Sequence, residues 1–92
     1  MENPKLRPGR EYLLEARSNL AAYEERVRES STLAMNVTHL TEAESYLKLA
    51  EQEGIPKSEI SHLREIINDY HNALEQGREE VFQLAKSRTG KF

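Results

Sequence analysis

The sequence predicts an all-α fold, and three observations lead to this expectation. Between residues 10 and 53 there is neither a glycine nor a proline, which is a long stretch without breakers for a non-helical fold. Apolar residues recur every three or four positions, the spacing of one helix face. β-Branched residues are few and do not alternate with polar ones, so the pattern does not indicate strands.

The first helix is expected over about residues 10–30, directly after Pro8-Gly9. Glu11 and Glu15 lie in its opening turns, where acidic side chains favour the positive end of the helix dipole. Its apolar stripe has the spacing 3-4-3-4, which places every member on one face: Leu13, Ala16, Leu20, Tyr23 and Val27.

A second apolar stripe follows, but on a different face. At about 100° per residue it is displaced by roughly 140° from the first, so one straight helix cannot present both to one neighbour. The displacement falls across Ser30-Ser31-Thr32, whose hydroxyls favour caps over helix interiors. We therefore expect a turn there and a second helix over about residues 33–53. Its stripe is Leu33, Val37, Leu40, Ala43, Leu47 and Ala50.

Two other arrangements of this region stay open. Thr41 and Glu44 have the spacing of a capping box, and Ala34 and Val37 remain in phase with the first stripe, which would move the break to about Thr38. With no break at all, the chain would form a long two-helix hairpin that dimerises into a four-helix bundle.

The next turn is expected at Glu53-Gly54-Ile55-Pro56, with a glycine after one helix and a proline at the start of the next. A third helix should then run over about residues 57–87, with Gly77 inside its seam. Close approach of another helix would explain that glycine, and the alternative is a tolerated imperfection that costs about 1 kcal/mol against alanine. The seam is spaced 3-4-3-4-3-4-3, and Ile66, Ala73, Phe82 and Ala85 widen it: Ile60, Leu63, Ile67, Tyr70, Leu74, Gly77, Val81 and Leu84.

These lengths predict an antiparallel three-helix bundle with a long third helix. At 1.5 Å per residue the third helix spans about 45 Å and the other two roughly 30 Å each. Its last turns, which carry Val81, Phe82, Leu84 and Ala85, should therefore extend beyond the bundle. Apolar residues on such an overhang are unfavourable in water, so they would need a partner protein, a second copy or the N-terminal segment.

Length and composition narrow the class of protein. Ninety-two residues make one domain. No apolar run approaches the roughly 20 residues of a membrane span, and the first residues lack the apolar stretch of a signal peptide. The absence of cysteine excludes disulfides and thiolate sites. Together these features favour a cytoplasmic protein that does not enter membranes.

Charge is unevenly distributed along the chain. Residues 11–80 hold fifteen acidic and seven basic residues, a net charge of −8, whereas residues 1–10 carry +2 and residues 81–92 carry +3. We interpret residues 1–9 and 88–92 as flexible basic ends. An acidic body repels phosphates, so nucleic acid is not the expected partner.

The chain offers no recognisable catalytic set. Glu59-Ile60-Ser61-His62 has the Glu-x-x-His spacing of di-iron bundles, but there is one copy where such sites need two. Carboxylate pairs such as Glu24-Glu25 are expected on solvated outer faces. The serines fall at predicted turns, where capping explains them. We therefore expect no enzyme activity, no metal or other cofactor and no small-molecule substrate.

The remaining hypothesis is a helical protein–protein interaction module of the adaptor, chaperone or regulatory-subunit type, binding a partner or a second copy through apolar helix faces. The alternative is a small nucleic-acid-associated regulator that uses the basic ends. The candidate interface consists of apolar residues that flank the stripes or lie on the overhang: Phe82, Leu84, Val81, Ile66, Tyr46, Leu49, Met35 and Tyr12.

Overall fold

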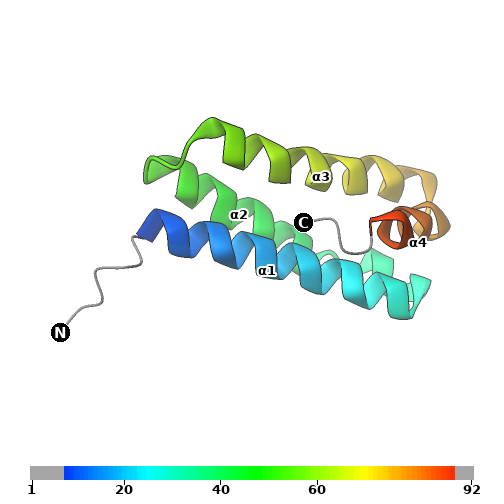
Figure 1. Cartoon of the computed structure of the whole chain (residues 1–92). Coiled ribbons are helices and arrows are strands. Elements are labelled where there is room, and N and C mark those ends of the chain that lie inside the picture. Colours follow the sequence, from blue (N-terminus) through cyan, green and yellow to red (C-terminus); the bar gives the residue numbers. More distant parts are fainter. Residues whose placement is uncertain (1–7, 89–92) are drawn as a thin grey trace.

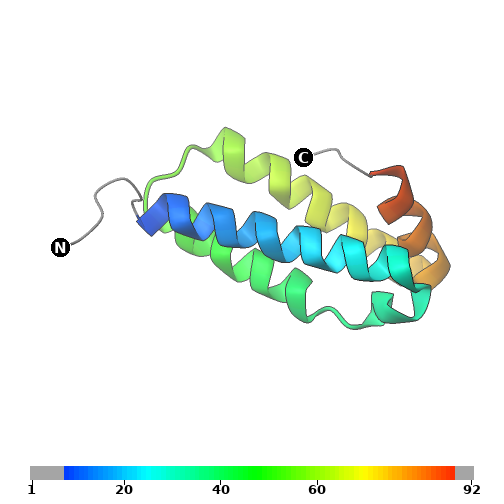
Figure 2. The ribbon, with the colours of Figure 1, turned by 60° about the horizontal axis from the view of Figure 1, so that its bottom comes forward.

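The computed structural model describes residues 8–88, and within this range the regular structure is entirely helical, which confirms the all-α expectation. The elements in chain order are α1 (Pro8–Glu29), the short 3₁₀ helix η1 (Ser31–Met35), α2 (Thr38–Gln52), α3 (Lys57–Gln76) and α4 (Arg78–Ser87). Helices α1, α2 and α3 run side by side, whereas α4 turns back at the end of α3 (Figures 1 and 2). α4 contacts α1, η1 and α3.

Helix α1 packs most extensively on α2. All five members of its predicted stripe are buried, so that prediction is confirmed. The helix begins slightly earlier than expected, because Pro8 and Gly9 form its first turn rather than a flexible end. A Cβ atom at Gly9 would lie 3.0 Å from the Cβ of Glu53 and 3.1 Å from Ile55. The glycine therefore lets α1 approach the turn after α2 closely.

Helix α1 ends at Glu29, at the turn expected near Ser30, which excludes an unbroken two-helix hairpin. Five residues of η1 follow, and α2 begins only at Thr38. The Asn36 side chain accepts hydrogen bonds from the Thr38 amide at 3.3 Å and hydroxyl at 2.9 Å, which helps to start the helix. The capping box at Thr41 was wrong, since the Thr41 amide already donates to the Val37 carbonyl at 2.9 Å inside the helical ladder.

The turn between α2 and α3 has the predicted glycine termination. Gly54 has a φ of 92°, its amide donates to the Glu51 carbonyl at 3.1 Å, and the Ile55 amide donates to the Ala50 carbonyl at 3.2 Å. This is the pair of hydrogen bonds of a Schellman motif. Pro56 then precedes the first residue of α3.

The prediction of a single long third helix was wrong, because the helical structure is interrupted at Gly77 and forms two helices, α3 and α4. Gly77 has a φ of 127° and a ψ of 167°, a conformation open to glycine and strained for other residues. No atom lies within 4 Å of its Cβ position, so close helix approach is not its role. The reversal returns α4 to the core, where Val81 and Ala85 are fully buried. Burial of one valine side chain contributes about 1.5–3 kcal/mol, so the fold has no apolar overhang.

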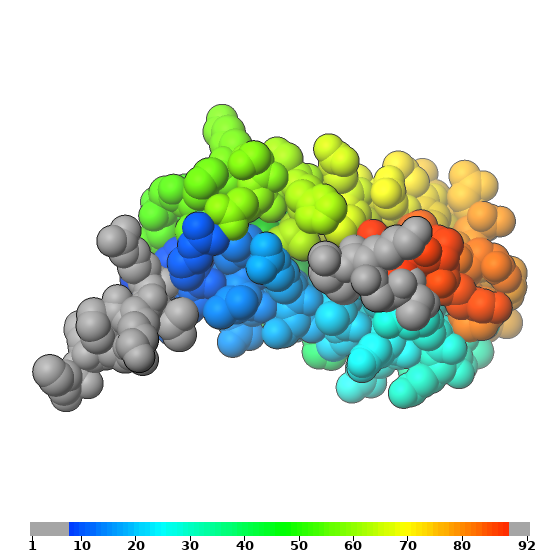
Figure 3. All heavy atoms as spheres, in the orientation of Figure 1, coloured from blue at the N-terminus to red at the C-terminus, as the bar shows by residue number. Residues whose placement is uncertain are grey.

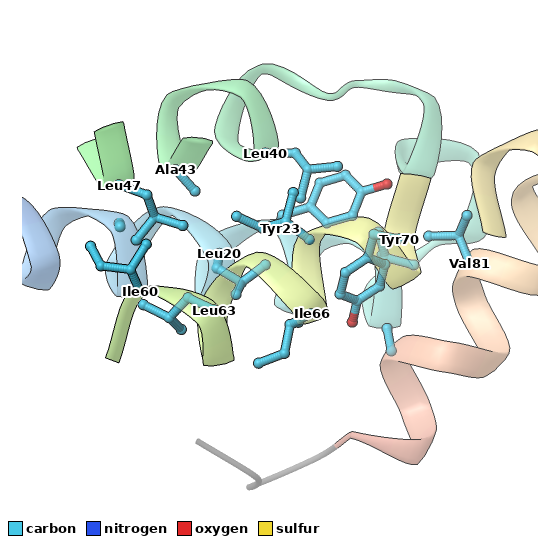
Figure 4. Close-up of a cluster of buried hydrophobic side chains, with 14 of the residues drawn as sticks. Leu20, Tyr23, Leu40, Ala43, Leu47, Ile60, Leu63, Ile66, Tyr70 and Val81 are labelled. Carbon is cyan, nitrogen blue, oxygen red and sulfur yellow. The ribbon is translucent and has the colours of Figure 1, made fainter. Parts of the chain in front are cut away.

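One hydrophobic core joins all four helices (Figure 4). Tyr23 of α1 and Tyr70 of α3 meet near its end, with ring centroids 5.3 Å apart and planes at 83°. The Tyr23 hydroxyl donates to the carbonyl of Ala34 in η1 at 2.6 Å, so the ring that fills the core also secures the connection between α1 and α2. Burial of the Tyr23 ring is favourable because its hydroxyl group has a hydrogen-bond partner.

Candidate functional site

The members of the predicted interface that belong to α3 and α4 lie mostly against the core. Val81 is fully buried and Ile66 is 4% exposed. Phe82 and Leu84 are partly buried and pack against the core from α4. These four side chains thus pack within one chain, and the overhang predicted for Val81, Phe82 and Leu84 does not form.

The other half of the predicted interface is divided between two places. Tyr12 of α1 and Tyr46 of α2 stack on each other, with ring centroids 6.1 Å apart and planes at 29°. Leu49 lies three residues after Tyr46 on the same side of α2, and it is 37% exposed. Met35, 61% exposed, belongs to η1 and lies away from this group. We call Tyr12, Tyr46 and Leu49 the tyrosine patch.

Carboxylates flank the tyrosine patch. Glu42, Tyr46 and Leu49 of α2 and Glu53, the residue directly after α2, have the spacing 4-3-4, so they form one stripe with an exposed glutamate at each end. On α1, exposed Glu15 follows Tyr12 by three residues. The patch is therefore an apolar surface with acidic neighbours on both helices.

Two basic side chains of α1 and α2, Arg10 and Lys48, lie toward α3 instead. Arg10 forms a double hydrogen bond to Glu59 of α3, at 2.6 and 3.1 Å. Lys48 lines a shallow hollow together with Arg64 and Ile67 of α3. The negative charge of the α1–α2 face is thus not neutralised by these cations, which lie on the other side of their helices.

A second unusual feature is a carboxylate buried in the core. The Glu24 side chain is 1% exposed. Its Oε2 accepts a hydrogen bond from the Tyr70 hydroxyl at 2.5 Å and one from Arg88 Nε at 2.6 Å. Its Oε1 is buried and accepts no hydrogen bond from residues 8–88. A buried charge needs such partners to be tolerated, so Glu24 depends on the chain after α4.

A second arginine contact attaches α4 to α1. Arg28 Nη1 donates to the carbonyl of Ala85 at 2.9 Å, near the C-terminal end of α4, where unpaired carbonyls and the helix dipole attract cations. In Figure 3, α4 in orange and red fits between the end of α3 and the end of α1. We call the surface of α1 and η1 that receives α4, with Glu24 and Arg28 as its polar contacts, the α4 dock.

Because two tyrosines are buried, the stability of the fold should decrease at alkaline pH. Burial raises the pKa of Tyr23 from 10.0 to about 12. Burial, with the hydrogen bond and charge of Glu24, also raises the pKa of Tyr70. Their contribution is complete below pH 10, because both phenols are then neutral in the folded and unfolded chains alike. Above pH 10 the unfolded chain releases protons that the folded chain retains, so stability falls as pH rises toward about 12 and beyond.

We expect each of these tyrosines to lower the free energy of unfolding by up to about 1.4 kcal/mol per pH unit in this window. Urea denaturation followed by circular dichroism at successive pH values measures the slope. The control is the double variant Tyr23→Phe, Tyr70→Phe, in which the slope should be smaller. An equal slope in both proteins would contradict the assignment.

Sequence reasoning placed Glu24 on a solvated outer face and Arg88 in a flexible end, and the structure corrects both. Glu24 follows Leu20 by four residues and precedes Val27 by three, so its position at the border of the apolar stripe was the available signal. For Arg88 no comparable signal exists, because its contact depends on the reversal at Gly77. The other residues assigned to flexible ends, 1–7 and 89–92, lie outside the described part of the chain.

The histidines and acidic groups do not converge on a common site. Within residues 8–88, no group of three His, Cys, Asp or Glu side chains is placed to hold a metal ion. His39 pairs with Asn19 at 2.9 Å and His71 with Glu44 at 3.1 Å, and His62 is exposed. None of the helices in this range is long and apolar enough to cross a membrane.

Fold and surface define the class of this chain: a small all-α protein whose described residues, 8–88, form four α-helices and carry the tyrosine patch with its acidic neighbours. No known protein family matches the chain, and neither curated proteins nor solved structures show a significant similarity to it.

Proposed function

We propose that this chain is a helical protein–protein interaction module that binds a basic, amphipathic helix of a partner protein through the tyrosine patch. The observation that carries the proposal is the stacked pair of Tyr12 and Tyr46, extended by exposed Leu49 and flanked by glutamates. Aromatic residues are enriched in protein interfaces, because they offer a large rigid surface at low conformational entropy.

The chemistry of the partner follows from this arrangement. Two parallel ridges of side chains, one from α1 and one from α2, suit an apolar stripe on a third helix. Glu15, Glu42 and Glu53 beside the patch favour lysine or arginine next to that stripe, and such pairs guide association and orientation. The absence of cysteine supports a reducing compartment such as the cytoplasm for this activity.

The alternative of a nucleic-acid regulator receives less support. It relies on the basic ends of the chain. Arg88 of the second end forms an ion pair with Glu24, and Arg10, next to the first end, forms one with Glu59. The described helices also carry the acidic surface that repels phosphate. A protein partner therefore remains the proposal.

The test uses a labelled synthetic helix that has leucines on one face and lysines beside them, and a matched peptide in which glutamates replace the lysines. Fluorescence anisotropy should show binding of the lysine peptide only. The double variant Tyr46→Ser, Leu49→Ser should weaken that binding at least ~10-fold. Met35→Ser is the control, because it removes an apolar side chain that is even more exposed than Leu49, 61% against 37%, and lies outside the patch.

Helicity of each variant is checked by circular dichroism. Equal affinity for the two peptides would contradict the predicted charge of the partner. Unchanged affinity in the Tyr46, Leu49 variant, or equal weakening by Met35→Ser, would show that the tyrosine patch is not the binding surface.

A further inference from the structure

We propose that α4 is an exchangeable arm: by straightening at Gly77, the chain inserts α4 into the α4 dock of a second copy and receives that copy's α4 in return. The product is a domain-swapped dimer of this chain. The inference does not rest on the proposed function, since the tyrosine patch and the α4 dock are different surfaces.

The first step concerns the hinge. A single residue, Gly77, separates α3 from α4, and its φ of 127° is what reverses the chain. The apolar spacing nevertheless continues through it, with Leu74, Gly77, Val81 and Leu84 at 3-4-3 intervals. Both sides therefore agree with one continuous helix. Straightening would complete the helical ladder at the junction, where each helix end otherwise leaves backbone groups without intrahelical partners.

The second step concerns what holds α4. Its polar contacts go to α1: Arg28 to the Ala85 carbonyl, and Arg88, just after α4, to Glu24. The two partners are 57 positions apart in the sequence in the first contact and 64 positions apart in the second. Neither contact depends on which chain supplies α4. The same holds for the buried positions of Val81 and Ala85. The dock can thus receive the α4 of another copy with identical contacts.

The third step concerns why a second copy is the occupant. Glu24 accepts hydrogen bonds from Tyr70 and Arg88, and a chain that releases α4 loses the bond from Arg88 while Glu24 keeps the one from the Tyr70 hydroxyl. Such a chain also exposes the apolar sites of Val81 and Ala85. Only a segment with an arginine directly after a short amphipathic helix restores both contacts, and the chain itself carries that segment. Exchange then changes one backbone conformation while retaining the packing.

The experiment begins with Gly77→Ala. Alanine is strained at the φ of the reversal but favoured in a helix, so the ratio of straightened to folded-back chains should rise roughly 30-fold or more. Light scattering across a dilution series should then detect a dimer. Gly54→Ala is the matched control, because its φ is also positive, at 92°, and its Cβ position is equally open. Pro56 prevents α2 and α3 from joining, so this variant should stay monomeric.

A charge-reversal pair distinguishes exchange from any other dimer. Glu24→Arg and Arg88→Glu each place like charges together when α4 docks within its own chain. When the two proteins are refolded as an equimolar mixture, exchange places an arginine opposite a glutamate in both docks. We expect the mixture to form a folded heterodimer and each variant alone to remain unfolded or to release α4.

The pair is prepared both with Gly77 and with Gly77→Ala, so the test stays valid if the hinge variant fails to fold. Heterodimer formation only on mixing supports exchange. A mixture that shows no recovery of helicity or mass in either background overturns it, and so does a Gly77→Ala variant that is folded and monomeric at high concentration.

Discussion

Replacing Tyr70 with alanine should lower the free energy of unfolding by about 4 kcal/mol. The side chain is fully buried, packs edge-on against Tyr23, and donates the hydrogen bond to Glu24. Its removal therefore opens a cavity and leaves a buried carboxylate with one partner fewer. A domain of this length has about 5–14 kcal/mol of stability, so the variant should unfold at much lower urea concentrations in a circular dichroism titration.

Tyr70→Phe separates the two causes. It keeps the ring and removes only the hydroxyl, so it should lower stability by about 1–3 kcal/mol, the range for leaving a buried acceptor without its donor. The difference between the two variants then measures the packing of the ring. If Tyr70→Ala is no more destabilising than Tyr70→Phe, the ring does not fill the core in the way the structure describes.

Replacing Arg88 with methionine should lower the free energy of unfolding by about 3–5 kcal/mol, since it leaves the Glu24 charge buried without a cation. Exposed ion pairs contribute far less, typically under 1 kcal/mol. Arg88 differs from those because its side chain is 14% exposed and that of Glu24 only 1%. Urea denaturation measures the total loss, and hydrogen exchange should show that residues 78–87 lose protection first.

The double variant Glu24→Gln, Arg88→Met is the control for this assignment. A neutral amide can still accept from the Tyr70 hydroxyl, so most of the lost stability should return even though one more native side chain is gone. This recovery is the signature of an uncompensated charge rather than of lost packing. Losses that simply add would contradict it, and a loss below about 1 kcal/mol for Arg88→Met would place the pair with ordinary surface pairs.

Both sets of predictions concern a partner of buried Glu24, and the contact of Glu24 with Arg88 also governs the proposed exchange. Arg88 and Glu24 hold α4 whether it comes from the same chain or from a second copy. Substitutions at this pair should therefore weaken the closed monomer and the swapped dimer alike, whereas Gly77→Ala acts on the hinge and shifts the ratio between them. Neither the substitutions at Glu24 and Arg88 nor Gly77→Ala should change the tyrosine patch.

Much of the fold was predictable because it depends on local pattern. The stripe from Leu13 to Val27 and the glycine turn at Gly54 need only helical periodicity and the conformational freedom of glycine. The break near Ser30 was predictable for a related reason, since the change of apolar face requires a turn. The 3₁₀ helix η1 that forms this break was not predictable, because it is held by the hydrogen bond between Tyr23 and Ala34, which are eleven residues apart.

The candidate sites divide in a similar way. Tyr46 and Leu49 were selected because they flank an apolar stripe, and the pairing of Tyr46 with Tyr12 follows once α1 and α2 lie alongside each other. The buried pair of Glu24 and Arg88 was not predictable, because both residues are of types that are usually exposed. The position of Glu24 at the border of the apolar stripe is a sequence signal for that residue alone, and only a contact spanning 64 positions identifies Arg88 as its partner.

The sequence by itself determined that this protein is helical, which faces of its helices are apolar, and where Ser30 and Gly54 interrupt them. These properties follow from side-chain periodicity and from residues that favour caps or positive φ, and both act over a few positions. Only the tertiary structure decided the fate of the chain after Gly77. There the apolar spacing fits a continuous helix, and the burial of Val81, Ala85 and the Glu24 ion pair outweighs local helix continuity.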